Sequence, residues 1–196
     1  MSFTQPSMPH LKRAMIFIDG QNLTKRFQSM KGKSKINPRP SVQHQENNFV
    51  WQPSHIEFHQ IAHSSVEILQ ANYYTVSKDS GFDSLFEKIK SALIEPPSSS
   101  LCLSPKIIRF NGKVKDPKGD DIKLCIDALN HAYQNNADIF YLFTGDGDFA
   151  PLAEELKRLG KYVFVAALSD GLSSNLKREA DFFWNLDERY FIKSNS

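Results

Sequence analysis

Short apolar runs alternate along the chain with segments that have helical periodicity. Residues 14–18 and 139–143 are uninterrupted apolar runs, and an Asp or a Thr-Gly-Asp sequence follows each of them directly. Runs of this length and composition are typical of strands that are buried on both faces of a sheet. By the same pattern we expect further strands at 66–76, 106–110, 162–168 and 182–184.

The segments between the strands have the spacing of amphipathic helices. In residues 82–93 the apolar side chains recur every three or four positions, which places them on one helical face. Pro151 suits the first turn of a helix, and Gly160 suits the position just beyond its end. Strands that alternate with crossover helices predict an α/β fold of three layers (α/β/α), in which helices cover both faces of a mainly parallel sheet of five or six strands. Further helices are expected at 21–30, 54–63, 120–133 and 175–180.

Three segments depart from this alternation. Residues 1–11 and 191–196 have little periodicity and are expected to be tails. Residues 31–53 are rich in Lys, Gln, Asn and Pro, which predicts a long surface insertion. We therefore expect one domain at 12–190, which suits a chain of 196 residues.

The composition is that of an ordinary globular chain, and it narrows the classes of function. The net charge of +2 excludes a strongly basic nucleic-acid module but leaves room for a local basic face. No apolar run is long enough to span a membrane, and the N-terminus lacks the apolar core of a signal peptide. Cys102 and Cys125 lie in apolar sequence without metal-ligand spacing, so we expect reduced core thiols in a cytoplasmic protein.

Aspartates follow the predicted strands at three places. Asp19 ends the first strand, and Asp146 and Asp148 follow the strand at 139–143. A third acidic segment, Asp120 and Asp121, follows a strand and a short basic loop. The carboxyl ends of parallel strands lie at one edge of the sheet, so these acids are expected to converge there. Converging carboxylates repel one another unless a cation lies between them, and Mg²⁺ and Mn²⁺ prefer oxygen ligands. The pattern predicts a divalent-metal site suited to phosphodiester hydrolysis.

Each acidic segment alone has an ordinary structural explanation. Asp19 with the glycine after it is a common turn sequence. Asp121 and Asp148 suit the caps of the helices that follow them. Only the coincidence of three such segments at one edge favours the metal site over turns and caps.

Three motifs in order also resemble a known family. They are Phe-Ile-Asp-Gly-Gln-Asn-Leu at 17–23, Lys-Gly-Asp-Asp-Ile-Lys-Leu-Cys-Ile-Asp-Ala-Leu at 118–129, and Thr-Gly-Asp-Gly-Asp-Phe-Ala-Pro-Leu at 144–152. These resemble the signatures of NYN domains, especially the LabA-like branch, within the PIN-like ribonuclease superfamily. The resemblance covers about residues 14–186. Three positions depart from the usual pattern: Thr144 stands for Ser, Gly147 for Ser, and Asp120 for a common Val.

The resemblance implies a Mg²⁺- or Mn²⁺-dependent endoribonuclease that acts on single-stranded or loop RNA. It implies that Asn22 and Thr144 bind the substrate. A non-catalytic regulator that retains the fold and binds RNA or a protein partner is the alternative, and a homodimer is left open. The acids that the resemblance assigns to metal binding and catalysis are Asp19, Asp121, Asp146 and Asp148.

Asp127 has two interpretations. On a regular helix it lies two turns from Asp120 on the same stripe, where it is a further candidate metal ligand. It is also four residues from Lys123, the spacing of an ordinary helical ion pair.

Several other side chains are candidates for contact with RNA. Phe49 and Trp51 either stack on bases or anchor the core. A histidine stripe in the helix expected at 54–63 lacks acidic partners, so it is interpreted as a helix face rather than a metal site: His55, His59 and His63. Three lysines before the helix of Asp121 are expected to hold the phosphate backbone: Lys113, Lys115 and Lys118.

Overall fold

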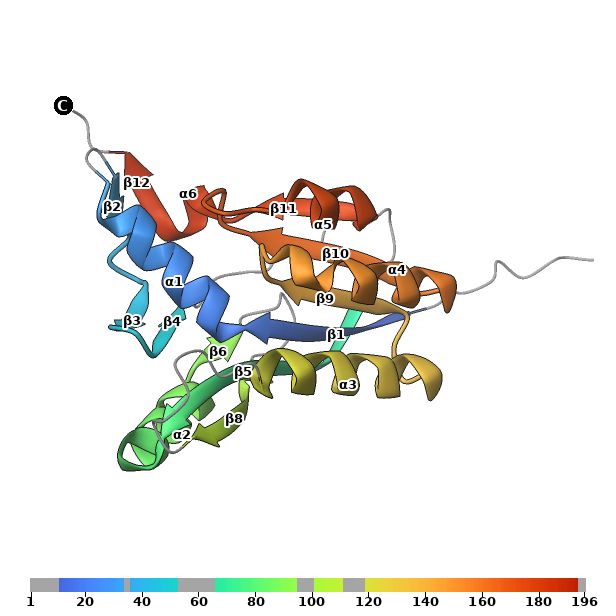
Figure 1. Cartoon of the computed structure of the whole chain (residues 1–196), viewed down its shortest axis with the longest axis horizontal. Coiled ribbons are helices and arrows are strands. Elements are labelled where there is room, and N and C mark those ends of the chain that lie inside the picture. Colours follow the sequence, from blue (N-terminus) through green and yellow to red (C-terminus); the bar gives the residue numbers. More distant parts are fainter. Residues whose placement is uncertain (1–10, 34–35, 53–65, 95–100, 111–118, 194–196) are drawn as a thin grey trace, which may run out of the picture.

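The centre of the molecule is a six-stranded sheet in which every neighbouring pair of strands is parallel (Figure 1). The structure is a computed structural model, and it describes residues 11–33, 36–52, 66–94, 101–110 and 119–193. The strand order is β11-β10-β9-β1-β5-β8, which confirms the predicted parallel α/β sheet. The strands are β1 (Lys12–Asp19), β5 (Val66–Lys78), β8 (Ser104–Phe110), β9 (Ile139–Phe143), β10 (Tyr162–Ala167) and β11 (Phe182–Asn185).

Helices cover both faces of this sheet and complete the three layers. The helices are α1 (Gly20–Lys31), α2 (Phe82–Lys90), α3 (Gly119–Tyr133), α4 (Ala150–Arg158), α5 (Ser174–Glu179) and α6 (Asp187–Tyr190). Buried residues of α1 and α2 belong to one hydrophobic cluster, and those of α3, α4 and α5 belong to another. Single 3-10 turns, η2 (Asp79–Gly81) and η3 (Gly147–Phe149), precede α2 and α4.

Strand β1 separates the two hydrophobic clusters. Ala14, Ile16 and Ile18 belong to the α1–α2 cluster, while Met15 and Phe17 belong to the α3–α5 cluster. Because successive side chains of a strand point to opposite faces, a strand that is covered on both sides needs apolar residues at every position. This packing explains the uninterrupted apolar run.

The order of the strands places a topological switch point between β1 and β9. From β1 the chain adds β5 and β8 on one side, and it then returns to add β9, β10 and β11 on the other. The connections that leave the carboxyl ends of β1 and β9 therefore diverge toward opposite faces, and ligands of such sheets bind in the crevice between them. Asp19 ends β1, and Thr144 directly follows β9.

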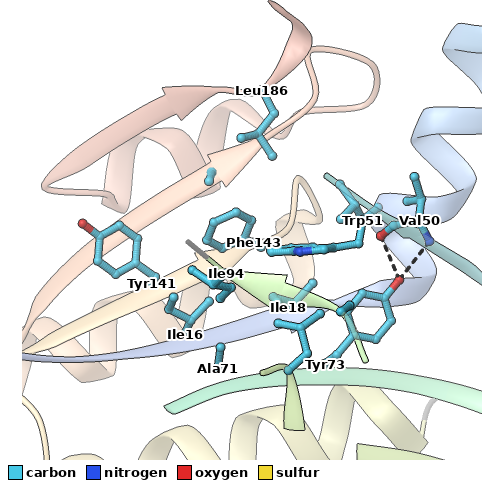
Figure 2. Packing of buried hydrophobic residues seen from close by; sticks show 14 of the residues in the cluster. Ile16, Ile18, Val50, Trp51, Ala71, Tyr73, Ile94, Tyr141, Phe143 and Leu186 are labelled. Atoms are coloured by element: carbon cyan, nitrogen blue, oxygen red, sulfur yellow. Dashed lines mark hydrogen bonds between the residues drawn. The ribbon is translucent and has the colours of Figure 1, made fainter. Parts of the chain in front are cut away.

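The segment expected to be a surface insertion contributes to the core. It contains β2 (Ile36–Pro38), β3 (Gln43–Gln45) and β4 (Phe49–Trp51), and all three residues of β4 are buried. The indole Nε1 of Trp51 donates to the carbonyl oxygen of Leu93 at 2.9 Å. The hydroxyl of Tyr73 pairs with the backbone of Val50 (Figure 2). The hypothesis that Phe49 and Trp51 stack on bases is therefore wrong, since both anchor the hydrophobic core.

Two other features, the C-terminal boundary and the environment of Cys102, differ from the expectation. Strand β12 (Phe191–Lys193) pairs antiparallel with β2, and Phe191 is buried, so ordered packing continues past residue 190. Cys102, in the hairpin of β6 (Leu93–Ile94) and β7 (Leu101–Cys102), is exposed and is not the core thiol that was expected. Cys125 is partly exposed, and neither cysteine forms a disulfide. The expected tail at 1–10 and helix at 54–63 lie outside the described residues.

The buried indole of Trp51 gives a test of the β4 packing. We expect Trp51→Ala to lower the free energy of unfolding by roughly 3–5 kcal/mol, because it leaves a cavity and removes the partner of the Leu93 carbonyl. Phe182→Ala, at an aromatic residue that is 40% exposed, should cost clearly less. Urea unfolding measures both. If Trp51→Ala lowers the free energy of unfolding by less than about 0.5 kcal/mol, β4 belongs to the surface and not to the core.

The start of α1 tolerates only glycine. A Cβ atom on Gly20 would lie 2.2 Å from Cε1 of Tyr73 and 2.7 Å from the carbonyl oxygen of Tyr74. We expect Gly20→Ala to lower the free energy of unfolding by about 1–3 kcal/mol, since the helix must move off β5. The matched control is Gly32→Ala, whose Cβ atom would meet nothing closer than 3.6 Å and whose stability should change by less than about 1 kcal/mol. Equal effects in thermal melts would contradict this account.

Candidate metal centre

Asp19 lies at the junction of the central strand and α1, and its side chain is 3% exposed. Its Oδ1 accepts a hydrogen bond from the backbone N–H of Asn22 at 2.9 Å, which caps α1. Its Oδ2 accepts from the hydroxyl of Thr144 at 2.9 Å, across the switch point. The carboxylate is thus fixed by one donor from each of the two diverging connections.

Asp120 and Asp121 bring a second and a third carboxylate from the first turn of α3. One carboxylate oxygen from each of Asp19, Asp120 and Asp121 lies within 4.8 Å of the other two. The Oδ2 of Asp120 accepts from Nε2 of Gln21 at 2.8 Å. Its Oδ1 is buried and, among the described residues, has no hydrogen-bond partner of good geometry. Asp120 itself is only 1% exposed, so this oxygen is a strong acceptor held away from bulk water.

Burial and mutual repulsion make this cluster costly to ionise. Burial is the main cause that raises the pKa of Asp19 to about 7, and the neighbouring carboxylates of Asp121 and Asp120 add to it; the donors from Asn22 and Thr144 act in the opposite direction. Burial also raises the pKa of Asp120. A divalent cation among the three oxygens would stabilise all three as carboxylates and would supply a partner for Oδ1 of Asp120. The donor set fits Mg²⁺ or Mn²⁺.

Asp146 and Asp148 lie beside this cluster but are not members of it. The Oδ1 of Asp146 accepts from the backbone N–H of Asp148 at 3.0 Å and caps the 3-10 turn η3. Asp148 is exposed. The structure therefore brings together Asp19 and Asp121, with Asp120 as the third acid, and leaves Asp146 and Asp148 at the rim.

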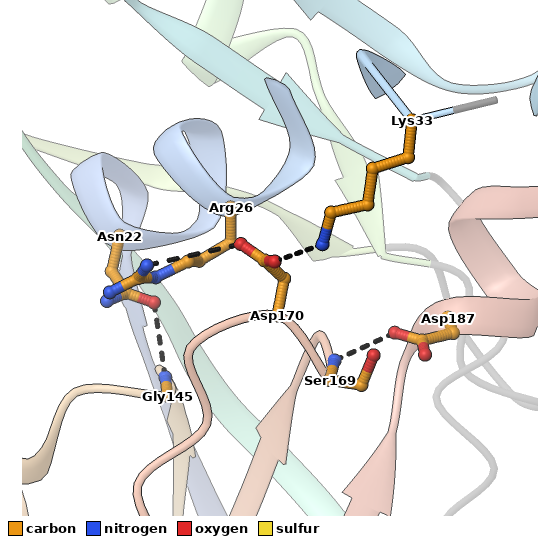
Figure 3. A network of polar contacts seen from close by, with 7 residues as sticks. All are labelled: Asn22, Arg26, Lys33, Gly145, Ser169, Asp170 and Asp187. Atoms are coloured by element: carbon orange, nitrogen blue, oxygen red, sulfur yellow. Dashed lines mark hydrogen bonds and ion pairs between the residues drawn. The ribbon is translucent and has the colours of Figure 1, made fainter. Parts of the chain in front are cut away.

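Asn22 and Thr144 both connect the carboxyl ends of β1 and β9. The side-chain oxygen of Asn22 accepts from the backbone N–H of Gly145 at 3.2 Å (Figure 3). The hydroxyl of Thr144 donates to Asp19 and accepts from the backbone N–H of Asp146 at 3.1 Å. Both side chains hold the site together, and contact of Asn22 with a substrate would have to come from its NH₂ group.

A loop after β10 is fixed to α1 on the same edge. Asp170 forms ion pairs with Arg26 of α1, at 4.0 Å, and with Lys33 just beyond it (Figure 3). Gly171 has a φ of +72°, and a Cβ atom there would lie 2.2 Å from the Arg26 guanidinium carbon. This contact keeps the loop close against α1.

Asp127 is accounted for by local partners. Its carboxylate pairs with Lys123 four residues earlier and accepts from the hydroxyl of Tyr74 at 3.0 Å. The interpretation as a helical ion pair is confirmed, and Asp127 is not a member of the cluster of three acids. The candidate phosphate contacts Lys113, Lys115 and Lys118, and the histidine stripe at 55–63, lie outside the described residues.

Asp120 was not among the predicted metal ligands, although the sequence held a signal for it. Leu124, Ala128 and Ala132 are the buried apolar face of α3. Residues four apart share a helical face, so the same stripe extended backward reaches Asp120 and not Asp121. A carboxylate at the head of a buried stripe requires a partner, and that requirement identifies it as a site residue.

Comparisons with known proteins identify the family and support the fold. The family model of the NYN domain matches residues 13–187. The chain is 30% identical over 85 residues to the uncharacterized protein MJ0482 of Methanocaldococcus jannaschii, and the match covers 43% of this chain and 35% of that protein, about a third of its length. The fold is similar to the crystal structure of VPA0982, a protein of unknown function from Vibrio parahaemolyticus, with a TM-score of 0.58 and 23% identity, over 96% of this chain and all of the other. The LabA-like branch is not resolved by these matches.

The raised pKa of Asp19 predicts how stability depends on pH. The ordinary value is 3.8 and the folded value is about 7. Between these two values the folded chain holds a proton that the unfolded chain has lost, so the free energy of unfolding of the metal-free protein falls as pH rises, by up to roughly 4 kcal/mol. Asn at this position retains an oxygen that caps α1, and it does not titrate. In Asp19→Asn the free energy of unfolding should therefore fall less as pH rises.

Urea unfolding in the presence of a chelator, at several pH values from about 4 to about 8, measures this effect. Mn²⁺ binds the ionised form, so adding it should restore stability to the wild type near the upper end of this range but not to Asp19→Asn. Identical pH slopes in the two proteins would show that the buried carboxylate does not control stability.

Proposed function

We propose, on the premise that this chain belongs to the NYN domain family, that it is a metal-dependent endoribonuclease that hydrolyses phosphodiester bonds of single-stranded or loop RNA. The observation that carries the proposal is the group of Asp19, Asp120 and Asp121 at the switch point of the sheet. Family membership makes a PIN-like nuclease fold the starting point. The fold alone does not determine the reaction, which depends on the residues and the geometry of the site.

The three acids form a site for a cation rather than a general acid–base pair. All three lie within 4.8 Å of one another, and two of them are almost completely buried. A buried group of like charges is stable only when protons or a cation neutralise it. Mg²⁺ or Mn²⁺ bound there would neutralise charge on a phosphate and lower the pKa of a water molecule. Asp19 would hold its ligand oxygen in a fixed direction, because Asn22 and Thr144 donate to its two oxygens.

The surroundings of the acids suit a phosphodiester chain that lies along the sheet edge. The crevice at the switch point is where extended ligands meet the carboxyl ends of parallel strands. Lys25 of α1 is close enough to lower the pKa of Asp120, so positive charge is present beside the acids. Single-stranded or loop RNA is proposed as the substrate because a cleavage site must present its phosphate to the recessed carboxylates.

The alternative is a regulator that binds RNA or a protein without cleaving it. The observation that favours it is that Asp146 caps η3 and that neither Asp146 nor Asp148 joins the cluster. Fewer acids near the phosphate would leave binding intact and weaken catalysis. Metal-dependent turnover separates the two functions, because a regulator shows none.

Cleavage of a mixed single-stranded RNA pool with and without Mn²⁺ tests the nuclease. Loss of a group that hydrogen-bonds to a metal ligand typically lowers metal affinity or activity by about 10–100-fold, so loss of a direct ligand should lower kcat/KM by at least about 100-fold. We expect this for Asp19→Asn, Asp120→Asn and Asp121→Asn, together with weaker Mn²⁺ binding by calorimetry. Folding should survive, because Asn is nearly isosteric and relieves repulsion.

The matched control is Asp181→Asn, which changes a carboxylate whose Oδ2 accepts the backbone N–H of Val163 at 2.8 Å. Its metal affinity and its cleavage rate should equal those of the wild type. If the wild type binds RNA but releases no product with Mn²⁺ or Mg²⁺, the nuclease proposal fails and the regulator takes its place.

A further inference from the structure

Helix α3 exposes apolar side chains on the side that faces away from the sheet. Its buried stripe is Leu124, Ala128 and Ala132. Ile122 and Ile126 lie on the other side and are 59% and 50% exposed. The outer face of a helix that packs on a sheet is normally polar, so an outward apolar stripe indicates a binding surface.

This stripe forms one wall of a cavity. The cavity has a volume of about 320 Å³ and lies between α3 and the turn η3, with Asp121 and Asp148 among its lining residues. Its volume is at the lower end of the range of small-molecule sites, which are likewise mostly apolar with a few polar groups. The apolar lining residues are Ile122, Cys125, Ile126, Leu129 and Phe149.

The cavity is continuous with the candidate metal centre. Asp121 belongs to both, since it lines the cavity and contributes an oxygen to the group of three acids. A ligand whose phosphate meets the metal centre therefore has the cavity directly beside it. The two carboxylates of the cavity, Asp121 and Asp148, repel an anion, so the phosphate itself is not the part of the ligand that enters. The apolar lining favours a flat group with apolar faces.

We propose that this cavity is a nucleobase subsite, which takes the base of the nucleotide next to the phosphate at the metal centre. The inference rests on the proposed function for its phosphate site. A base has apolar faces that pack against Ile122 and Ile126, and its edge carries N–H groups that a carboxylate accepts. The carboxylate of Asp148 favours a base with an exocyclic amine, as in guanine, adenine or cytosine, over uracil. Entry requires an unstacked base, which restricts the substrate to single-stranded RNA.

A second copy of this chain is the competing occupant of the stripe. An interface between copies needs about 800 Å² from each partner. The cavity has a volume of about 320 Å³ and is lined at one end by Asp121 and Asp148, which suits a single planar ring better than a helix.

Isoleucine methyl resonances of the 196-residue chain report on the cavity without any requirement for catalysis. The probes are the four ribonucleoside 5′-monophosphates, with ribose 5-phosphate as the ligand that lacks a base. We expect the Ile122 and Ile126 methyl signals to shift with the guanine, adenine and cytosine nucleotides and to shift least with the uracil nucleotide. Ribose 5-phosphate should leave them unchanged. Ile192, which is 42% exposed on β12, is the internal control and should not respond.

A matched pair of variants connects the cavity to the reaction. Ile126→Gln removes apolar surface without adding charge, and Ile192→Gln makes the same change elsewhere. We expect Ile126→Gln to raise KM for a short single-stranded RNA at least tenfold with kcat within about twofold, and Ile192→Gln to change neither. Both residues are substantially exposed, so thermal melts should show that both variants fold.

The outcomes separate this inference from the nuclease proposal. If nucleotides shift the Ile122 and Ile126 signals but RNA is not cleaved, the nuclease proposal fails and the subsite stands. If RNA is cleaved with wild-type KM by Ile126→Gln and no nucleotide shifts the signals, the subsite is overturned and the nuclease stands. Shifts that follow protein concentration instead of nucleotide would identify an interface between copies and would also overturn the subsite.

Discussion

The carboxylate of Asp19 is removed from water at the end of the central strand, and the carboxyl edge of the sheet is arranged around it. An isolated buried carboxylate is among the least favourable groups in a protein interior. Two hydrogen-bond donors reach its two oxygens, from the backbone of Asn22 and the hydroxyl of Thr144. They do not offset burial and the two neighbouring acids, since the pKa of Asp19 remains near 7. The site therefore needs either a proton or a cation to offset its negative charge.

Helix α1 holds the otherwise diverging loops of this edge in one arrangement. Gln21 donates to Asp120 of α3, Asn22 accepts from Gly145 after β9, and Arg26 pairs with Asp170 after β10. Gly20 allows the helix to lie against β5 at this point. These contacts hold the acids in fixed positions, and fixed ligand positions favour metal binding. No described helix is both long and apolar enough to cross a membrane.

Three consecutive residues of α3 occupy three different environments. Asp120 is buried against α1, Asp121 is partly exposed between the acids and the cavity, and Ile122 is mostly exposed on the outer wall. Successive residues of a helix differ by about 100° in direction, so one turn can serve the core, the metal centre and the cavity at once. The acids and the cavity are adjacent because they belong to the same turn.

The sequence by itself determined the six strands of the central sheet, the helices α1 to α5 and the edge at which the acids gather. These features depend on local periodicity and on the rule that parallel strands end at one edge. Only the tertiary structure decided which acids meet. Asp146 was predicted from its place after β9, but its carboxylate caps η3, while Asp120 rather than Asp121 lies on the buried face of α3. The polar composition of residues 31–53 likewise concealed the buried residues of β4. Side-chain direction and burial are set by contacts between residues far apart in the chain, and local composition does not record those contacts. The spacing of the buried stripe of α3 pointed to Asp120, but nothing local to β4 or to Asp146 indicated the partners that the fold gives them.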